Sequence, residues 1–336
     1  MEEPKEVDKE YAENEKRRGA NEGISKAGLI WFFFLQVIAL VFIFLYLLDK
    51  GTYGWTLFCV IPFSIGLTIG VFVKTYYSKK LIKGTGLTLG ILFILSLLLL
   101  FAGFEGAICI IMAAGIIGAP ALAGMFVGYL IRDAHIIYVL AIIFFTNSSS
   151  YVYDINDKTK VNSVTSRSMQ INASAETVWR TLTNPVGFSE INNLFFKSGV
   201  VHPVSMQLQQ TQDGCFLFCN LDHGKVSLPV TEIDTFRRLR FSVPDTIAPM
   251  RELSLYDSLD AKHLRGYFAA SYGEFEIEPV NNNSCRLIAR TSYTYKITPA
   301  FYWRWWSDYL VNVMHKHVLE DVKTMAEKSV NQPDGH

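Results

Sequence analysis

Four apolar runs without a charged residue constrain this chain more than any other feature. They cover residues 27–48, 54–73, 84–104 and 107–131. Each is long enough for a helix that crosses a hydrocarbon core of about 30 Å. The first run is too long for a signal-peptide core and no small-x-small cleavage site follows it, so it predicts a retained anchor. Beyond about residue 145, charged residues are regularly mixed with apolar ones.

This contrast divides the chain into three predicted regions. Residues 1–26 form a polar tail, residues 27–153 a transmembrane region, and residues 160–330 a domain of another kind. The formal net charge is zero, which argues against nucleic acid as a partner. No Asp, Glu, Lys, Arg or His lies inside the four runs, so an ion or proton path is not expected. Glycine pairs at small-xxx-small spacing predict close helix packing instead: Gly66/Gly70, Gly86/Gly90 and Gly124/Gly128.

Basic residues indicate the orientation of the spans. They gather before the first run and between the second and third, which puts both segments on the cytoplasmic side: Lys16, Arg17, Arg18 and Lys26, then Lys74, Lys79, Lys80 and Lys83. Residues 134–146 are apolar but short for a span. If they cross, the following domain lies outside the cytoplasm; if they stay in the interface, it is cytoplasmic. Lacking a polar face, they favour crossing. We therefore expect an integral protein of the plasma (inner) membrane with four or five spans.

The second half reads as strands enclosed between helices. Ser174 can cap a short helix over residues 175–182, and residues 188–196 form a second one. Strands are expected over the following ranges: 164–171, 204–210, 215–221, 225–233, 238–243, and a hairpin of 264–279 with 285–295. In this hairpin Glu278 faces Arg286 and Glu274 faces Arg290, while Phe275 and Ile277 point to the buried face. Both ion pairs are expected to be exposed.

Residues 299–327 predict one long helix, because no Gly or Pro interrupts them after Pro299. An apolar stripe recurs at three- and four-residue steps through Trp303, Trp306, Leu310, Val313, His317, Asp321 and Met325, widened by Met314. Such a helix needs a large partner surface, which the strands provide. The predicted class is α+β: a bundle of four to five transmembrane helices, followed by a curved antiparallel sheet around a long C-terminal helix.

Several stretches of this second half resemble a known superfamily. They are INASAETVW after the first strand, PMRELSLY at residues 249–256, GYFAASYGEFEIEP, and PAFYWRWWSDYLVNVMHKHVL near the end. Together they look like the START/Bet v 1-like superfamily, closest to polyketide cyclase/dehydrase-type SRPBCC proteins with an N-terminal membrane region. The resemblance covers about residues 164–327 and extends loosely to FEGAICIIMAA in the membrane half. It implies the helix-grip fold and a deep hydrophobic ligand cavity, but no single activity.

Candidate cavity residues follow from the predicted stripe and hairpin: Tyr256, Tyr267, Ser271, Tyr293, Trp306, Leu310 and His317. We expect His317 to be a core residue partnered by Asp321. The pair His315 and His317 points about 200° apart on a helix, so no metal site is expected. Arg251-Glu252 can be a solvated loop pair or a buried carboxylate with its partner. Five cysteines predict no disulfide framework, and no catalytic residue or cofactor site is recognisable.

Three functions remain open from the sequence. The first is a membrane-anchored protein that binds a hydrophobic small molecule or lipid in an internal cavity. The second is a cyclase- or aromatase-like enzyme that uses Tyr, His or a carboxylate in the same cavity as acid and base. The third is a structural or signalling module with a core filled by side chains. An open apolar cavity favours the first, converging ionisable groups the second, and a filled core the third.

Overall fold

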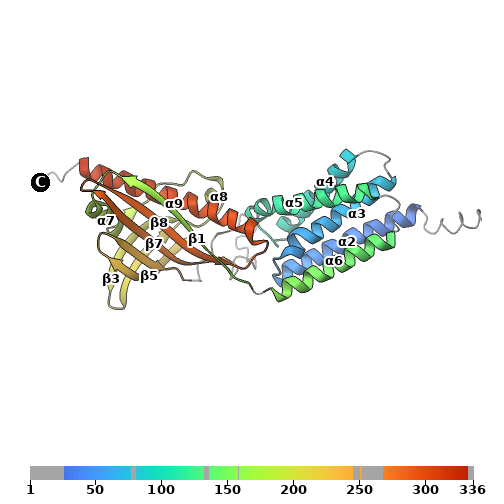
Figure 1. The fold of residues 1–336 in the computed structure, drawn as a ribbon, viewed down its shortest axis with the longest axis horizontal. Helices are drawn as coiled ribbons and strands as arrows, with labels where there is room; N and C mark the ends of the chain where they lie inside the picture. The colour runs from blue at the N-terminus through green and yellow to red at the C-terminus, as the bar shows by residue number, and fades with distance from the viewer. Residues whose placement is uncertain are drawn as a thin grey trace, which may run out of the picture.

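The computed structural model describes residues 26–76, 81–131, 136–157, 159–244, 250–251 and 268–331. Over these residues the chain forms two units joined end to end (Figure 1). We call residues 26–156 the helical bundle and residues 161–331 the C-terminal unit. The bundle contains these helices in chain order: α2 (Lys26–Lys50), the π-helical turn η1 (Thr56–Val60), α3 (Ile61–Tyr76), α4 (Leu81–Phe101), α5 (Ala107–Leu130) and α6 (Ile136–Asn156).

Four stretches of the described helices are long and apolar enough to cross a membrane: Phe33–Lys50, Thr56–Lys74, Leu81–Phe101 and Ala107–Leu130. The stretch through η1 and α3 is the most enclosed of the four, with 72% of its residues buried. It packs closely on α5, and the two glycine pairs that meet there explain how. A methyl group added at Gly66 would overlap the carbonyl oxygen of Ala121, and one at Gly124 would overlap that of Phe63. Close packing is thus confirmed for these two glycine pairs.

The third glycine pair behaves differently. A methyl group at Gly86 or Gly90 of α4 would meet nothing within 4 Å. The spacing at this pair therefore does not mark a helix contact within the chain, and the prediction of close packing is wrong there.

Helix α6 follows the length of the bundle beside α2 and returns the chain to the C-terminal unit (Figure 1). Two of its polar side chains, Asn147 and Asp154, face inward, whereas Thr146, Ser148, Ser149 and Asn156 are exposed. Asn147 donates to the Ser64 hydroxyl (2.8 Å), and Asp154 accepts from the backbone N–H groups of Trp55 (3.1 Å) and Thr56 (2.8 Å). Asp154 thus caps the start of η1, where helical N–H groups lack partners. The helix continues ten residues beyond the predicted apolar segment because the bundle satisfies these polar groups.

The described residues of the C-terminal unit form an eight-stranded antiparallel sheet in the order β1-β8-β7-β6-β5-β4-β3-β2. Their bounds are β1 Val161–Ile171, β2 Val186–Gly187, β3 Pro203–Thr211, β4 Gly214–Leu221, β5 Gly224–Asp234, β6 Arg238–Ser242, β7 Phe268–Asn281 and β8 Ser284–Tyr295. Two short helices, α7 (Ala175–Thr183) and α8 (Leu194–Lys197), lie between β1 and β3 in the chain. Ser174 caps α7 as predicted, accepting from the Thr177 N–H (3.2 Å).

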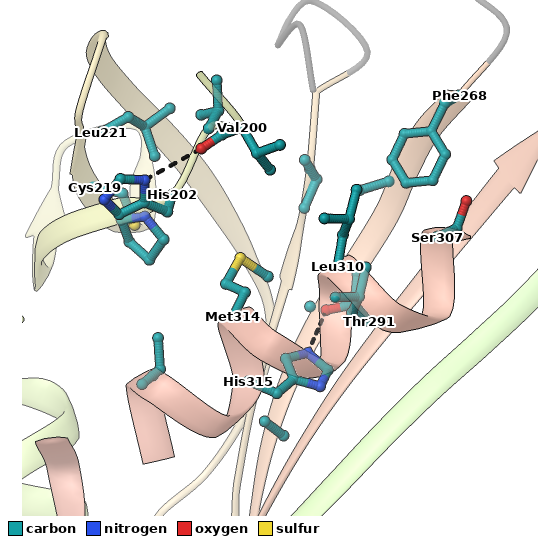
Figure 2. Close-up of a pocket in the computed structure, with 18 of the residues that line it drawn as sticks. Val200, His202, Cys219, Leu221, Phe268, Thr291, Ser307, Leu310, Met314 and His315 are labelled. Atoms are coloured by element: carbon teal, nitrogen blue, oxygen red, sulfur yellow. Dashed lines mark hydrogen bonds between the residues drawn. The ribbon is translucent and has the colours of Figure 1, made fainter. Parts of the chain in front are cut away.

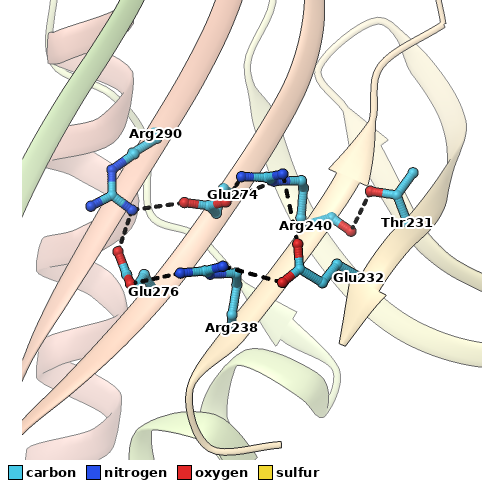
Figure 3. A network of polar contacts seen from close by, with 7 residues as sticks. All are labelled: Thr231, Glu232, Arg238, Arg240, Glu274, Glu276 and Arg290. Atoms are coloured by element: carbon cyan, nitrogen blue, oxygen red, sulfur yellow. Dashed lines mark hydrogen bonds and ion pairs between the residues drawn. The ribbon is translucent and has the colours of Figure 1, made fainter. Parts of the chain in front are cut away.

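The predicted register of the β7–β8 hairpin is confirmed. Glu278 pairs with Arg286, Glu274 with Arg290, and Phe275 with Ala289, while Phe275 and Ile277 are buried. The expectation that both ion pairs are exposed is wrong for Glu274, whose side chain is 3% exposed. Figure 3 shows its carboxylate between Arg240 (2.6 Å) and Arg290 (2.7 Å). The remaining members of this network are Glu276 on the same strand and, on neighbouring strands, Glu232 and Arg238.

The long helix is confirmed as α9 (Ala300–Asn331), which lies along the sheet (Figure 1). The phase of the predicted stripe is wrong in its second half. The buried residues of α9 are Leu310, Val311, His315, Val318, Leu319, Val322 and Ala326. His317 and Asp321 instead contact the segment before α8: the His317 Nε2 lies 2.7 Å from the Ser189 carbonyl oxygen, and Asp321 accepts from the Ser189 N–H (2.7 Å).

The first half of α9 has a second partner, the near end of the helical bundle. The Tyr302 hydroxyl donates to the Met112 carbonyl oxygen of α5 (2.5 Å), and the Thr298 N–H donates to the Tyr53 carbonyl oxygen (3.2 Å). A buried cluster joins α5, α8 and α9 through Ile108, Met112, Ile191, Phe196, Val200 and Leu310. The aromatic density of this part of α9 follows, because the helix buries one face against the sheet and another against α5 and α8.

Candidate functional site

A cavity of about 310 Å³ lies between the sheet and α9. Its wall is almost entirely apolar. The sheet contributes Met206, Leu217, Cys219, Leu228, Phe241, Gly273, Phe275 and Ala289; α9 contributes Trp303, Leu310, Met314 and Val318. Small residues help to keep the space open, because Ala269, Ala270 and Ala289 leave little side-chain volume on β7 and β8, whereas the place beside Gly273 is occupied by the Phe241 ring. A volume of this size lies at the lower end of small-molecule sites.

At the bundle end, α5 contributes to the wall of the cavity. Cys109 and Met112, from the first two turns of α5, belong to its wall together with Ile297 and Trp303. Phe58 of η1 packs behind Trp303, with ring centroids 5.0 Å apart. The wall is therefore built by both units of the chain.

The polar centre of the cavity is His315. Its Nε2 lies 2.8 Å from the hydroxyl of Thr291 on β8 (Figure 2). Burial, and secondarily the positive charge of Arg167, lower the pKa of His315 to about 4. The imidazole is thus neutral near pH 7. Its Nδ1 is buried and has no hydrogen-bond partner among the described residues.

A second polar group on the wall is the indole of Trp303. Its Nε1 is buried and, within the described ranges, has no hydrogen-bond acceptor. An unsatisfied buried donor is costly, and a bound ligand can offset that cost by accepting the hydrogen bond. The residues that line the cavity therefore combine a large apolar surface with two buried polar atoms that lack a hydrogen-bond partner among the described residues.

At the far side of the cavity, His202 lies in the loop before β3. Its Nδ1 is 3.2 Å from the Val200 carbonyl oxygen, as Figure 2 shows, and its ring meets Phe196 edge-on with centroids 5.7 Å apart. Asp222 lies 3.8 Å away. This histidine is held by its own loop, so it shapes the rim of the cavity.

The structure distributes the sequence-predicted site residues unevenly. Leu310 lines the cavity. Trp306 packs edge-on against Phe195 on the α8 side, with centroids 5.3 Å apart. Tyr293 is fully buried behind the wall, where it stacks on Phe268 and its hydroxyl donates to Asp308 (2.6 Å). Neither Trp306 nor Tyr293 is part of the cavity wall.

The remaining predicted residues lie elsewhere. Ser271 is exposed, because a bulge between Ala270 and Tyr272 shifts the alternation of β7 at this position. His317 contacts Ser189 and lies 3.4 Å from Asp321. Tyr256, Tyr267 and Glu252 lie outside the described residues.

Sequence reasoning missed His315, Thr291 and the contribution of α5. His315 was detectable only through the correct phase of the α9 stripe, because Leu310, Val311, His315, Val318 and Val322 follow helical spacing equally well. Thr291 lies on the predicted buried face of β8, opposite Gly273. Cys109 and Met112 carried no signal, since they stand inside an apolar run like any other.

The topology defines the class of fold: strand, two short helices, antiparallel strands and a long C-terminal helix lying along the sheet. The C-terminal unit has the helix-grip fold that the sequence resemblance implied. The whole chain is an α+β protein with four long apolar helices before this unit.

Known proteins resemble this chain only weakly. No family model matches the chain, and no curated protein matches its sequence. Among solved structures, norcoclaurine synthase from Thalictrum flavum is 10% identical, with a TM-score of 0.32 over 52% of this chain and 99% of that one. The Zhui aromatase/cyclase from Streptomyces sp. R1128 is 14% identical, with a TM-score of 0.31 over 52% and 100%. A Staphylococcus aureus protein of unknown function is 7% identical, with a TM-score of 0.33 over 52% and 100%. These identities and TM-scores are too low to infer a function for this chain from those structures.

Proposed function

We propose that this chain is a membrane-anchored helix-grip protein that binds a hydrophobic small molecule or lipid in the cavity between its sheet and α9. The observation that carries this proposal is the open apolar cavity of about 310 Å³. Burial of apolar ligand surface would supply the binding free energy, at roughly 25 cal/mol per Å².

The cavity supports binding better than acid-base catalysis. An enzyme of the cyclase type needs ionisable groups that converge on the reacting atoms. On the described part of the wall, the neutral His315 and Thr291 are adjacent. His202 and Ser307 also line the cavity, but each is bonded to a backbone carbonyl oxygen, of Val200 and Trp303 respectively. Glu274 and Arg290 lie on wall strands, but strand alternation turns them to the opposite face from Gly273 and Thr291, where they bond each other. A filled core, the third alternative, is inconsistent with the cavity.

The membrane anchor is proposed to have five crossings, with α6 as the last. Its 21 residues span about 31 Å, which matches a hydrocarbon core of about 30 Å. Its inward polar groups are bonded within the bundle, whereas Phe145 (66%), Val152 (54%) and Ile155 (49%) expose apolar surface. The low hydropathy of its second half is thus compatible with lipid around it. Five crossings and a cytoplasmic basic end would put the C-terminal unit on the non-cytoplasmic side.

The binding proposal is tested on the full chain purified in lipid nanodiscs. Native mass spectrometry and organic extraction should find a bound small molecule in the wild type. Met314→Trp should remove it, because a larger side chain would fill the cavity (Figure 2). Lys316→Trp, two residues away on the exposed face of α9, is the matched control and should retain the ligand. Equal occupancy in both variants, at unchanged melting temperature, would contradict the proposal.

A further inference from the structure

The contact between α5 and α9 puts one wall of the cavity at the end of a membrane helix. Cys109 and Met112 lie in the first two turns of α5, and both line the cavity. Tyr302 of α9 hydrogen-bonds to the Met112 carbonyl oxygen. The start of α9 is therefore fixed to the near end of the bundle, and the cavity reaches the same place.

The length of α5 indicates where this wall of the cavity lies relative to the bilayer. Its 24 residues span about 36 Å, slightly more than a hydrocarbon core of about 30 Å. If α5 crosses the bilayer, its first two turns lie at the boundary between acyl chains and headgroups. Ile111, between the two cavity residues in sequence, is 54% exposed and presents apolar surface to that boundary.

An exposed aromatic stripe continues this apolar surface onto α9. Phe301 (71% exposed), Trp305 (60%) and Tyr309 (37%) follow one another at four-residue steps, so they share one face of the helix. Leu194 of α8, which is 71% exposed, precedes Phe195, whose ring meets that of Tyr309 edge-on with centroids 6.1 Å apart. The ring of Phe301 lies 6.4 Å from that of Trp55 at the start of η1. The stripe is thus continuous with the outer surface of the bundle.

The bilayer that surrounds the bundle is a better environment for such a stripe than water. Tyr and Trp concentrate at membrane interfaces, where an apolar ring and a polar edge are both accommodated. Four large apolar side chains exposed together form a patch that a soluble surface rarely carries. The charged residue Arg304, on the neighbouring face of α9, is compatible with a position at the membrane interface. Its side chain is 59% exposed and can extend to the lipid headgroups.

We propose that the first three turns of α9 lie in the membrane interface and that the cavity exchanges its ligand with the adjoining leaflet, across the contact of α5 with α9. The ligand class is then a membrane-resident amphiphile. Its apolar body occupies the sheet side of the cavity. This inference rests on the proposed binding function and adds the source of the ligand and its route.

Two variants separate the route from the cavity itself. Phe301→Glu with Trp305→Glu adds charge to exposed side chains that are not part of the cavity wall, so folding and ligand capacity should be retained. It should lift the start of α9 from the interface and slow loading from the bilayer. Lys316→Glu changes charge on an exposed face nearer the other end of the same helix and is the matched control. Met314→Trp, which fills the cavity, reports non-specific labelling.

The experiment is photocrosslinking of the full chain in nanodiscs with two probes. The first is a phosphatidylcholine with a diazirine at the end of one acyl chain, which is confined to the bilayer. The second is a short-chain fatty acid with a diazirine, added from water. Peptide mapping then scores adducts on the cavity-lining segments of α9 and the sheet.

We expect the bilayer probe to label the cavity in the wild type and in Lys316→Glu, several-fold less in Phe301→Glu/Trp305→Glu, and not above background in Met314→Trp. The aqueous probe should label the double variant and the wild type equally. Cavity adducts from the aqueous probe alone would overturn the route and leave the binding function intact. Equal bilayer labelling of the double variant would overturn the interfacial position of α9. Failure of both probes, together with no co-purified ligand, would count against the binding function.

Discussion

The neutral state of His315 links the cavity to the pH dependence of folding. Burial lowers its pKa to about 4 in the folded chain, whereas an unfolded chain protonates near the ordinary value of about 6.5. Below pH 6.5 the unfolded state therefore binds a proton that the folded state binds only near pH 4. This difference lowers the free energy of unfolding as pH falls through that window, and it has no effect above it.

The expected size is roughly 3 kcal/mol at the low end of the window, at 1.36 kcal/mol per pKa unit. His315→Gln removes the titrating group and keeps an amide within reach of the Thr291 hydroxyl. We expect the wild type to lose more stability than this variant between about pH 7 and pH 4. Denaturant unfolding of the full chain in detergent across this range measures the difference. Parallel pH profiles for the two proteins would show that His315 is solvated in the fold.

The buried carboxylate of Glu274 gives a second residue-level prediction. It is 3% exposed between Arg240 and Arg290, whereas Glu278 on the same strand is 49% exposed and lies 3.7 Å from Arg286. Removing a partner from a buried pair leaves charge uncompensated, so Glu274→Ala should cost roughly 2–4 kcal/mol. Glu278→Ala should cost less than about 1 kcal/mol, as for other exposed pairs. Equal losses in thermal or denaturant unfolding would mean that water reaches Glu274.

At the scale of elements, the contact between α3 and α5 depends on missing side chains. A methyl group at Gly66 would overlap the Ala121 carbonyl oxygen, so Gly66→Ala must push the two helices apart. Overpacking of this kind costs about 1–3 kcal/mol. Gly90→Ala in α4 meets no atom within 4 Å and is the matched control, expected to be neutral or slightly stabilising. Thermal unfolding of both variants in detergent distinguishes them, and a neutral Gly66→Ala would refute the close contact.

Element by element, local patterns predicted most of the fold. The β7–β8 register followed from alternating Glu and Arg residues, because a one-residue slip would expose Phe275 and Ile277. The phase of α9 did not follow. Trp303, Trp306 and Leu310 form a stripe against α5 and α8, while Val311, His315 and Val318 form another toward the sheet. A single-stripe interpretation combined the two, and so favoured His317 over His315.

Ser271 illustrates a different limit. Strict alternation from Phe275 through Gly273 puts it on the cavity face, but the bulge at this position adds one residue to β7 and turns Ser271 to solvent. Ala270 then pairs with Tyr293 and Phe268 with Tyr295. No residue type in this stretch marks the bulge, so it can be seen only once the partner strand is in place.

For the whole molecule, the sequence indicated two units but not their shared surface. The cavity wall from α5 and the aromatic stripe on α9 lie where the two units meet. Contacts between such distant segments do not produce a hydrophobic periodicity that the sequence of either segment would show. Residues 134–153 were ambiguous for a related reason. Asn147 lowers their hydropathy, but its side chain bonds to Ser64 inside the bundle, and Asp154 just beyond them bonds to the start of η1. Such partners are visible only after assembly of the bundle.

The last prediction concerns the side of the membrane on which the C-terminal unit lies. The start of α2, with Lys26, and the end of α3, with Lys74, are at the end of the bundle away from this unit (Figure 1). With α6 as a fifth crossing, the unit is non-cytoplasmic. Lys225→Cys, exposed at the turn between β4 and β5, gives a labelling site in a background without the five native cysteines. A membrane-impermeant maleimide should label it in intact cells, with Lys83→Cys at the basic end as the protected control. Labelling of Lys225→Cys only after lysis would put the unit in the cytoplasm and leave α6 without a crossing.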